Sequence, residues 1–222
     1  MSIAENLKGI VEQLPQNVQL VAVSKFHPLE NILEAYDAGQ RVFAESRPQE
    51  LAAKAAELDR EKYPDLEWQF IGHLQTNKLK MVLPYVSLVQ SVDSVHLLKE
   101  IQKWAAAAGR EVSVLLEVHI GAEETKQGFH EEEVVDLLFD ADKYPNIRFC
   151  GLMAMASHTT DESVIDADFE RIDTFMAYLV DLFPELTDFN QLSIGMSDDW
   201  KIAIHHGATI IRIGTAIFGN RE

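Results

Sequence analysis

Cysteine and long apolar runs are both nearly absent from this sequence. Cys150 is the only cysteine among 222 residues, so no disulfide can form within the chain, which is typical of a reducing compartment. No apolar run approaches the roughly 20 residues of a membrane-spanning helix. The opening MSIAENLKGIVEQL lacks the basic and then apolar regions of a secretion signal. We therefore expect a cytoplasmic protein without a membrane partner, with Cys150 in the core.

Positive charge is also scarce. The chain has 19 Lys and Arg residues against 36 Asp and Glu, a formal charge of −17. This charge opposes binding to nucleic acids or anionic membranes, and we expect neither as a partner. No G-x-G-x-x-G or Walker loop is present. The histidines lack metal-ligand spacing, so no metal site is expected at His27, His73, His119, His158, His205 or His206.

Eight short apolar segments alternate with amphipathic or alanine-rich ones. We expect strands over 18–23, 41–46, 67–72, 87–92, 112–120, 147–155, 190–195 and 208–214. Helices are expected over 3–14, 28–38, 48–58, 76–83, 94–108, 131–140, 163–183 and 197–206, with a glycine- and acid-rich loop at 121–128. This alternation predicts a single-domain (β/α)8 TIM-type barrel with an extra N-terminal helix. An open doubly wound sheet is the alternative, although it usually has fewer strands.

The segment VQLVAVSKFHP at 18–28 ends an apolar strand on Lys25. By alternation Lys25 lies on the same strand face as Val21 and Val23, and it therefore points into apolar surroundings. In a barrel, this end of a strand is where chemistry takes place. Desolvation lowers the pKa of a lysine, and the neutral amine is the form that attacks an aldehyde. The alternative interpretation is a loop lysine that reaches solvent.

Two turns, SIGMSDD and RIGTAIFG, follow the last two strands, where barrels often bind phosphate. Ser197 is also a predicted N-cap, and the alternative is that Ser197 only caps a helix and Gly214 only relieves a turn. Arg212 shares a strand face with Ile210 and Gly214, so it should point inward and need a partner. A surface arginine on a frayed edge is the alternative for Arg212.

A buried lysine, a phosphate seat and an inward arginine at one barrel mouth suggest an aldehyde cofactor that bears a phosphate. Pyridoxal 5′-phosphate (PLP) fits this description. A lysine Schiff-base aldolase acting on a phosphorylated sugar accounts equally well for Lys25 and the phosphate turns, but it leaves Arg212 less well explained.

Six motifs occur in order: AVSK, FAESRPQE, FIGHLQTNK, GLMAM, SIGMSDD and IRIGTAIFG. With them the sequence resembles the pyridoxal phosphate homeostasis protein family over about 18–220. That family has a barrel like the N-terminal domain of alanine racemase. The resemblance implies that residues 1–222 form a single PLP-binding barrel domain with PLP on Lys25. It further implies phosphate contacts from Ser197, Gly214 and Thr215, a pyridine-nitrogen contact from Arg212, and ring contacts from Ile71, His73 and Met155.

One motif departs from the family pattern. Where the family usually reads FGEN, this chain reads FAES, so that Ala44 replaces the glycine and Ser46 the asparagine. The usual asparagine lies near the ring oxygen of the cofactor. Serine is shorter and carries only a hydroxyl, so the contact from Ser46 is either lost or bridged by water.

The resemblance implies a protein that carries PLP as a lysine Schiff base, supports intracellular PLP (vitamin B6) and amino-acid homeostasis, and passes PLP to apo-enzymes. We expect a monomer or weak dimer without substantial catalysis, and we assign no catalytic residue. The alternative is a PLP-dependent amino-acid racemase. Racemases add a tyrosine base from a separate β-domain, for which this chain has no residues to spare. Only His73, His158 or Ser157 would be left as a second base, and the sequence shows no orienting partner for them.

Overall fold

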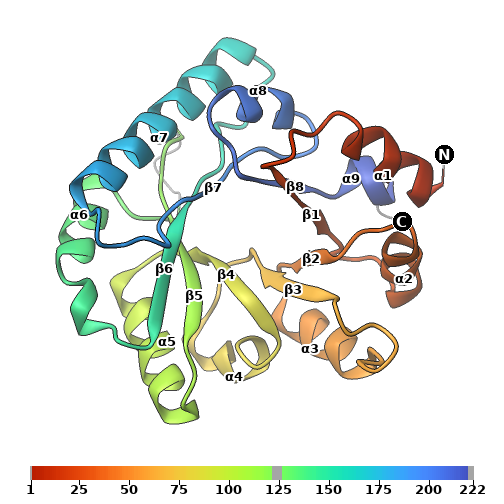
Figure 1. Cartoon of the computed structure of the whole chain (residues 1–222), viewed down its shortest axis with the longest axis horizontal. Coiled ribbons are helices and arrows are strands. Elements are labelled where there is room, and N and C mark those ends of the chain that lie inside the picture. Colours follow the sequence, from red (N-terminus) through yellow and green to blue (C-terminus); the bar gives the residue numbers. More distant parts are fainter. Residues whose placement is uncertain (1, 122–126, 220–222) are drawn as a thin grey trace.

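A closed barrel of eight parallel strands forms the centre of the computed structural model, which describes residues 2–121 and 127–219. The strands follow one another around the barrel in sequence order, and β8 pairs with β1 (Figure 1). They are β1 (Gln19–Val23), β2 (Val42–Glu45), β3 (Glu67–Phe70), β4 (Val86–Val92), β5 (Val112–Glu117), β6 (Ile147–Met153), β7 (Gln191–Ser193) and β8 (Ile210–Ile213). The predicted barrel is therefore confirmed, and the open sheet is excluded.

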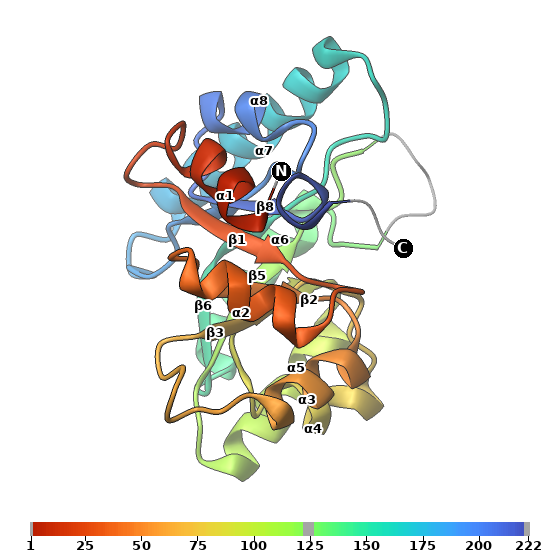
Figure 2. The same cartoon turned by 90° about the vertical axis from the view of Figure 1, so that its right-hand side faces the viewer.

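Helices surround the strands on the outside of the barrel (Figures 1 and 2). They are α1 (Ile3–Val11), α2 (Leu29–Asp37), α3 (Pro48–Glu57), η1 (Thr76–Lys78), α4 (Leu79–Val82), α5 (Val95–Ala108), α6 (Glu131–Phe139), η2 (Ala141–Lys143), α7 (Glu162–Leu182), α8 (Trp200–His205) and α9 (Thr215–Phe218). The extra N-terminal helix, α1, packs against α2 and α9. The Asn6 amide fastens α1 to α9 by donating to the Ile217 carbonyl oxygen at 2.9 Å.

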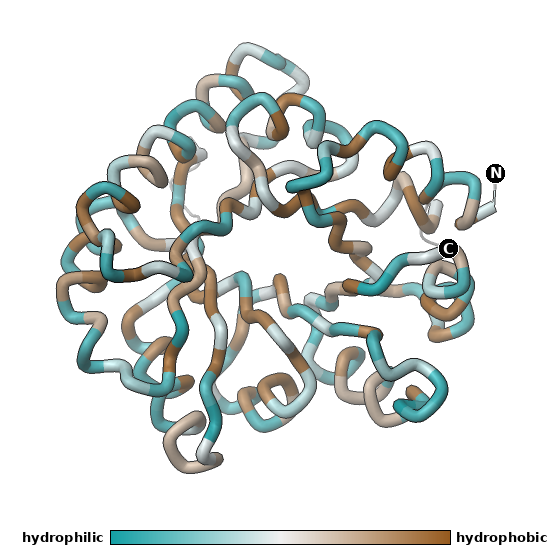
Figure 3. Tube along the Cα trace, in the orientation of Figure 1, coloured by the Kyte–Doolittle hydropathy of each residue, from teal (hydrophilic) through white to brown (hydrophobic). Residues whose placement is uncertain are grey.

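The strands separate two apolar layers. Val21 and Val23 belong to a cluster inside the barrel, which also contains Cys150 and Ile210. Ala22 packs instead in the larger cluster between the strands and the helices. Figure 3 shows the corresponding pattern, with hydrophobic residues recurring along the strands and alternating with hydrophilic ones on the helices. The inward direction of the face that carries Arg212, predicted from alternation, is thereby confirmed, whereas Lys25 lies beyond the end of β1 at Val23.

Several boundaries differ from the sequence-based expectation. Helix α1 ends at Val11 rather than residue 14, because the Gln13 and Leu14 amides bond to carbonyl oxygens three residues back, at Ile10 and Val11, instead of four. Ser197 is not an N-cap, so that prediction was wrong. Helix α8 begins at Trp200 after Asp199, whose carboxylate accepts a hydrogen bond from the Met196 amide and closes a turn first. The short helices η2 and α9 were not predicted.

Two further observations concern the described part of the chain. None of its helices combines the length and the apolar character that crossing a membrane requires. Of the predicted loop at 121–128, residues 122–126 lie outside the described residues.

Candidate functional site

A cavity of about 320 Å³ opens at the carboxyl end of the barrel strands. Eight of the nine predicted site residues line it: Lys25, Ser46, Ile71, Met155, Ser197, Arg212, Gly214 and Thr215. The ninth, His73, is not part of the lining. Its side chain is 49% exposed, and its Nδ1 lies 2.9 Å from Oδ2 of Asp93. His73 thus has the orienting carboxylate that the sequence did not reveal, but it lies beside the cavity.

Seven more residues line the cavity and were not predicted as binding residues: Val23, His27, Met153, His158, Met196, Asp198 and Gly219. Val23 and Met153 follow from strand alternation, because each lies two residues before a predicted site residue. The His27 ring is held at the cavity by stacking on the Phe218 ring, with centroids 5.0 Å apart. No local sequence pattern predicts this contact. That contact holds the loop after β1 against α9.

Lys25 lies in the loop that follows β1 and is half-buried. The Ser24 amide continues the strand pairing by donating to the Ala44 carbonyl oxygen at 3.0 Å. The loop then closes as a turn, because the His27 amide donates to the Ser24 carbonyl oxygen at 3.1 Å. Lys25 therefore leaves the barrel wall within a short, hydrogen-bonded turn rather than on a long loop.

Ser46 and Ile71 reach the same wall of the cavity because the turns after β2 and β3 lie against each other. A Cβ atom at Gly72 would lie only 2.1 Å from the carbonyl oxygen of Ser46. Only glycine permits this approach. The close approach of these two turns thus explains the glycine of the FIGHLQTNK motif.

The turns after β7 and β8 form the opposite wall. Gly195 has a φ of +88°, and a Cβ atom there would lie 2.6 Å from Cβ of Ala203. Glycine therefore lets the turn with Ser197 fold down onto α8. Gly214 is the N-cap of α9 and Thr215 its first residue. The first amide groups of a helix have no intrahelical acceptor, so amides and the Ser197 and Thr215 hydroxyls meet at this wall.

Arg212 forms the floor of the cavity, and only 4% of its surface is exposed. Its Nη1 donates to the carbonyl oxygen and the hydroxyl of Ser193 at 2.7 and 2.6 Å. Its Nη2 donates to the Ala154 carbonyl oxygen at 2.9 Å. Burial lowers the pKa of Arg212 to about 10, which still leaves it charged at neutral pH. The predicted inward arginine with partners is confirmed, and the frayed-edge alternative is excluded.

The Arg212 contacts continue as a polar chain inside the barrel. The Ser193 hydroxyl donates to Oε1 of Gln90 at 2.6 Å, and Nε2 of Gln90 donates to Oε1 of Gln69 at 2.5 Å. Both glutamines are buried. Because each member fixes the next, the guanidinium has little freedom to move away from the cavity floor.

Glu117, the last residue of β5, is a titratable group near this floor that the sequence analysis missed. Only 5% of its surface is exposed. Burial raises its pKa to about 7, the charge of Asp93 adds to the rise, and Arg212 and His73 oppose it. The predicted strand ran on to residue 120, which hid the fact that Glu117 ends it. Strand β5 stops there because the His119 amide pairs with the Phe129 carbonyl oxygen instead.

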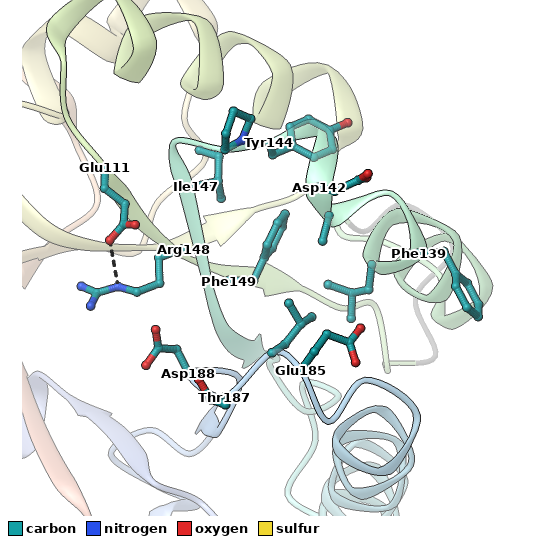
Figure 4. Close-up of a pocket in the computed structure, with 14 residues that line it drawn as sticks. Glu111, Phe139, Asp142, Tyr144, Ile147, Arg148, Phe149, Glu185, Thr187 and Asp188 are labelled. Carbon is teal, nitrogen blue, oxygen red and sulfur yellow. Dashed lines mark ion pairs between the residues drawn. The ribbon is translucent and has the colours of Figure 1, made fainter.

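A second hollow, of about 560 Å³, lies near the start of β6 and contains none of the predicted site residues (Figure 4). Its rim carries Glu111, Asp142, Glu185 and Asp188, and Arg148 forms an ion pair with Glu111 at 3.5 Å. Strand starts in a barrel serve stability rather than chemistry. Within residues 2–121 and 127–219, no group of three or more His, Cys, Asp or Glu side chains is placed to hold a metal ion.

Comparison with known proteins gives consistent matches along the whole chain. The family model described as "Alanine racemase, N-terminal domain" matches residues 1–222. A pyridoxal phosphate homeostasis protein of Vibrio alginolyticus is 36% identical over 233 residues, covering 100% of this chain and 98% of the relative. The protein of the same name from Aquifex aeolicus is 36% identical over 237 residues and is covered completely, as is this chain.

Solved structures agree with these relatives. The structure of PipY from Synechococcus elongatus with PLP bound is 38% identical and has a TM-score of 0.91, covering 98% of this chain and 100% of PipY. An alanine racemase of Clostridium difficile shares the fold, with a TM-score of 0.74 and 17% identity. This chain covers only 56% of that racemase, so the likeness is confined to part of the longer protein.

Proposed function

The chain belongs to the pyridoxal phosphate homeostasis protein family, and we propose that it binds PLP as a Schiff base on Lys25 and acts as a PLP carrier. The single observation that best supports this proposal is the composition of one cavity. Lys25, Arg212 and the Gly214–Thr215 turn line the same space of about 320 Å³. Small-molecule sites typically have volumes of about 300–1,000 Å³ and combine apolar walls with a few polar groups.

The residues of the cavity fit the chemical groups of PLP. Lys25 supplies the amine for the aldehyde, and Ser197, Gly214 and Thr215 supply hydroxyl and amide donors for the phosphate. Ile71, Met153 and Met155 supply apolar surface for the ring. Ser46 lies within the same lining, where its hydroxyl reaches the ring oxygen through a water molecule. His73, which lies outside the lining, is not included in this proposed set.

Attachment requires only that the neutral Lys25 amine add to the aldehyde carbon. A C=N bond forms, and the aldehyde oxygen leaves as water. Addition of water reverses the step and restores both the lysine and free PLP. This reversibility suits a carrier that takes part in PLP (vitamin B6) and amino-acid homeostasis and passes PLP to apo-enzymes inside the cell.

Arg212 argues against strong catalysis. PLP acts as an electron sink most effectively when its ring nitrogen is protonated and paired with a carboxylate. Here the buried Arg212 guanidinium, rather than a carboxylate, faces the ring nitrogen. Its positive charge disfavours protonation of that nitrogen, because two adjacent cations repel each other. Racemisation also needs a base on each face of the substrate, and no tyrosine is found among the described residues that line the cavity.

The amino-acid racemase remains the second candidate, because His73 does have an orienting carboxylate in Asp93. Incubation of the PLP-loaded protein with L- and D-alanine in deuterated water separates the two functions. The carrier predicts no more than stoichiometric deuterium uptake at Cα. Sustained exchange or racemisation that disappears in Lys25→Ala makes the protein an enzyme.

The carrier function itself is tested by transfer. PLP-loaded protein is mixed with a defined PLP-dependent apo-enzyme while a scavenger traps free PLP. The proposal predicts that the apo-enzyme gains activity despite the trap. Activation that the trap abolishes completely refutes direct transfer. A loaded protein without a visible absorption band refutes Schiff-base attachment of PLP. The aldolase alternative, which uses no PLP, predicts that no such band is seen.

A further inference from the structure

The backbone next to Lys25 has an unusual conformation. Phe26 has a φ of +68° and is the only non-glycine residue with positive φ within residues 2–121 and 127–219. A bulky residue occupies this region only when its surroundings hold it there. Side chains of α3, the helix that follows β2, hold Phe26 in this conformation.

Glu50 of α3 supplies the first part of the restraint. Its Oε1 accepts a hydrogen bond from the Phe26 amide at 2.6 Å. The same oxygen accepts from Nζ of Lys54, one helical turn further along α3, at 2.8 Å. The Arg47 guanidinium also covers the Phe26 ring, 4.2 Å from its centroid. Phe26 is therefore held through its backbone and its ring.

Lys54 supplies the second part. Its Nζ donates to the Ser24 carbonyl oxygen at 2.9 Å and to Oε1 of Glu45 at 2.6 Å. With the bond to Glu50, all three ammonium hydrogens have acceptors. The Ser24 hydroxyl completes the cluster by donating to the same Glu45 oxygen at 2.6 Å. The side chains of Lys54 and Glu45 are 9% and 0% exposed, so water competes little for these bonds.

These contacts hold both peptide bonds of Lys25. The Ser24 carbonyl belongs to the peptide bond that precedes Lys25, and the Phe26 amide belongs to the one that follows it. Lys54 binds the first and Glu50 binds the second. Neither Glu45, Glu50 nor Lys54 lines the cavity. The cluster thus contacts the backbone on either side of Lys25 without lining the cavity.

We propose that the Glu50–Lys54 pair, supported by Glu45, positions Lys25 for attack on the aldehyde of PLP. This inference rests on the proposed function. Attack requires the amine to lie close to the aldehyde carbon along a narrow approach, and a misplacement of about 1 Å can slow such a step about 100-fold. Holding both flanking peptide bonds restricts the starting point of the lysine side chain. The three cluster residues are positioning residues.

Three variants of α3 test the proposal. Glu50→Ala removes the acceptor for Phe26 and Lys54, whereas Glu50→Gln keeps an acceptor oxygen. Glu57→Ala is the matched control, because Glu57 is an exposed glutamate on the same helix. The rate of Schiff-base formation is measured by absorbance at saturating PLP. Affinity for pyridoxamine 5′-phosphate, which has the ring and phosphate but no aldehyde, is measured in parallel.

We expect Glu50→Ala to slow Schiff-base formation about 10- to 100-fold. Its affinity for pyridoxamine 5′-phosphate should stay close to that of the unmodified protein. Glu50→Gln should recover most of the rate, and Glu57→Ala all of it. Equal rates in Glu50→Ala and Glu57→Ala overturn the proposal. So does an equal loss of rate and of pyridoxamine phosphate affinity, which marks a general structural role.

If Glu50→Ala does not fold, Glu50→Asp provides the test. It keeps the charge but is one methylene shorter, so its carboxylate cannot reach both partners, and the same slowing is expected. A rate equal to that of the unmodified protein overturns the proposal. Failure of the proposed function looks different, because the unmodified protein itself then forms no Schiff base with PLP.

Discussion

The Arg212 guanidinium donates two hydrogen bonds to Ser193, one to its carbonyl oxygen at 2.7 Å and one to its hydroxyl at 2.6 Å. The same Ser193 hydroxyl donates to the Gln90 side chain inside the barrel, so hydrogen bonds connect Arg212 to Gln90. The arginine is therefore part of the barrel core and part of the candidate site. Its position is determined by the fold before any ligand arrives.

Arg212→Met should destabilise the protein. The change leaves the buried Ala154 carbonyl oxygen without this donor, at a cost of about 1–3 kcal/mol, whereas the Ser193 carbonyl oxygen keeps its hydrogen bond from the Ala154 amide. We expect the free energy of unfolding, measured with urea, to fall by about 1–3 kcal/mol. Arg148→Met is the control, since the Arg148 side chain is 48% exposed. Equal stability of the two variants contradicts the structural role of Arg212.

Glu117 should make stability fall as pH rises. Its pKa is about 7 in the folded protein and near 4.5 in the unfolded chain, because burial disfavours the charged form. Between these values the folded state binds more protons, so stability decreases with increasing pH. Relative to that of Glu117→Gln, the free energy of unfolding of the unmodified protein should fall by about 2–3 kcal/mol between pH 5 and pH 8.

The matched control for this titration is Glu111→Gln, because the Glu111 side chain is 57% exposed. A difference in unfolding free energy between Glu117→Gln and the unmodified protein that stays constant from pH 5 to pH 8, or that varies no more than for Glu111→Gln, contradicts the raised pKa of Glu117.

The phosphate seat predicts selectivity for PLP over pyridoxal. Thr215→Val removes a hydroxyl from the N-terminus of α9 with little change in shape. A hydrogen bond to a charged group contributes about 1.5–3 kcal/mol, so PLP should be retained at least about ten-fold less tightly. Affinity for pyridoxal, which lacks the phosphate, should not change.

Thr187→Val, outside the cavity, serves as the control. Equal affinity of the unmodified protein for PLP and pyridoxal contradicts a phosphate site.

The barrel and most of the cavity could be predicted from the sequence because they depend on local periodicity. Alternation alone places Val21, Val23 and Lys25 on one strand face, and Ile210 and Arg212 on another. The closed structure then brings the strand ends together. Eight predicted residues consequently line one cavity although they are spread over 190 positions between Lys25 and Thr215.

Features that depend on contacts between elements were not predictable in this way. A lysine on an alanine-rich helix, such as Lys54, is most often a solvent-facing residue, and only the fold places it beneath Ser24. Ser197 was assigned as an N-cap from residue type, but Asp199 provides the side-chain contact at the turn instead. Glu117 was missed because apolar residues continue beyond the point where the strand ends. His73 was placed in the site by motif, whereas its pairing with Asp93 holds it outside the cavity lining.

The most direct test of the account is the identity of the lysine that carries PLP. The PLP-loaded protein is reduced with borohydride, digested and mapped by mass spectrometry, together with Lys25→Ala and the control Lys78→Ala. Attachment at Lys25 predicts one mass increment, on the peptide that contains Lys25, in the unmodified protein and in Lys78→Ala, and none in Lys25→Ala. An increment that persists in Lys25→Ala, or that maps to Lys78 or another lysine in the unmodified protein, contradicts it.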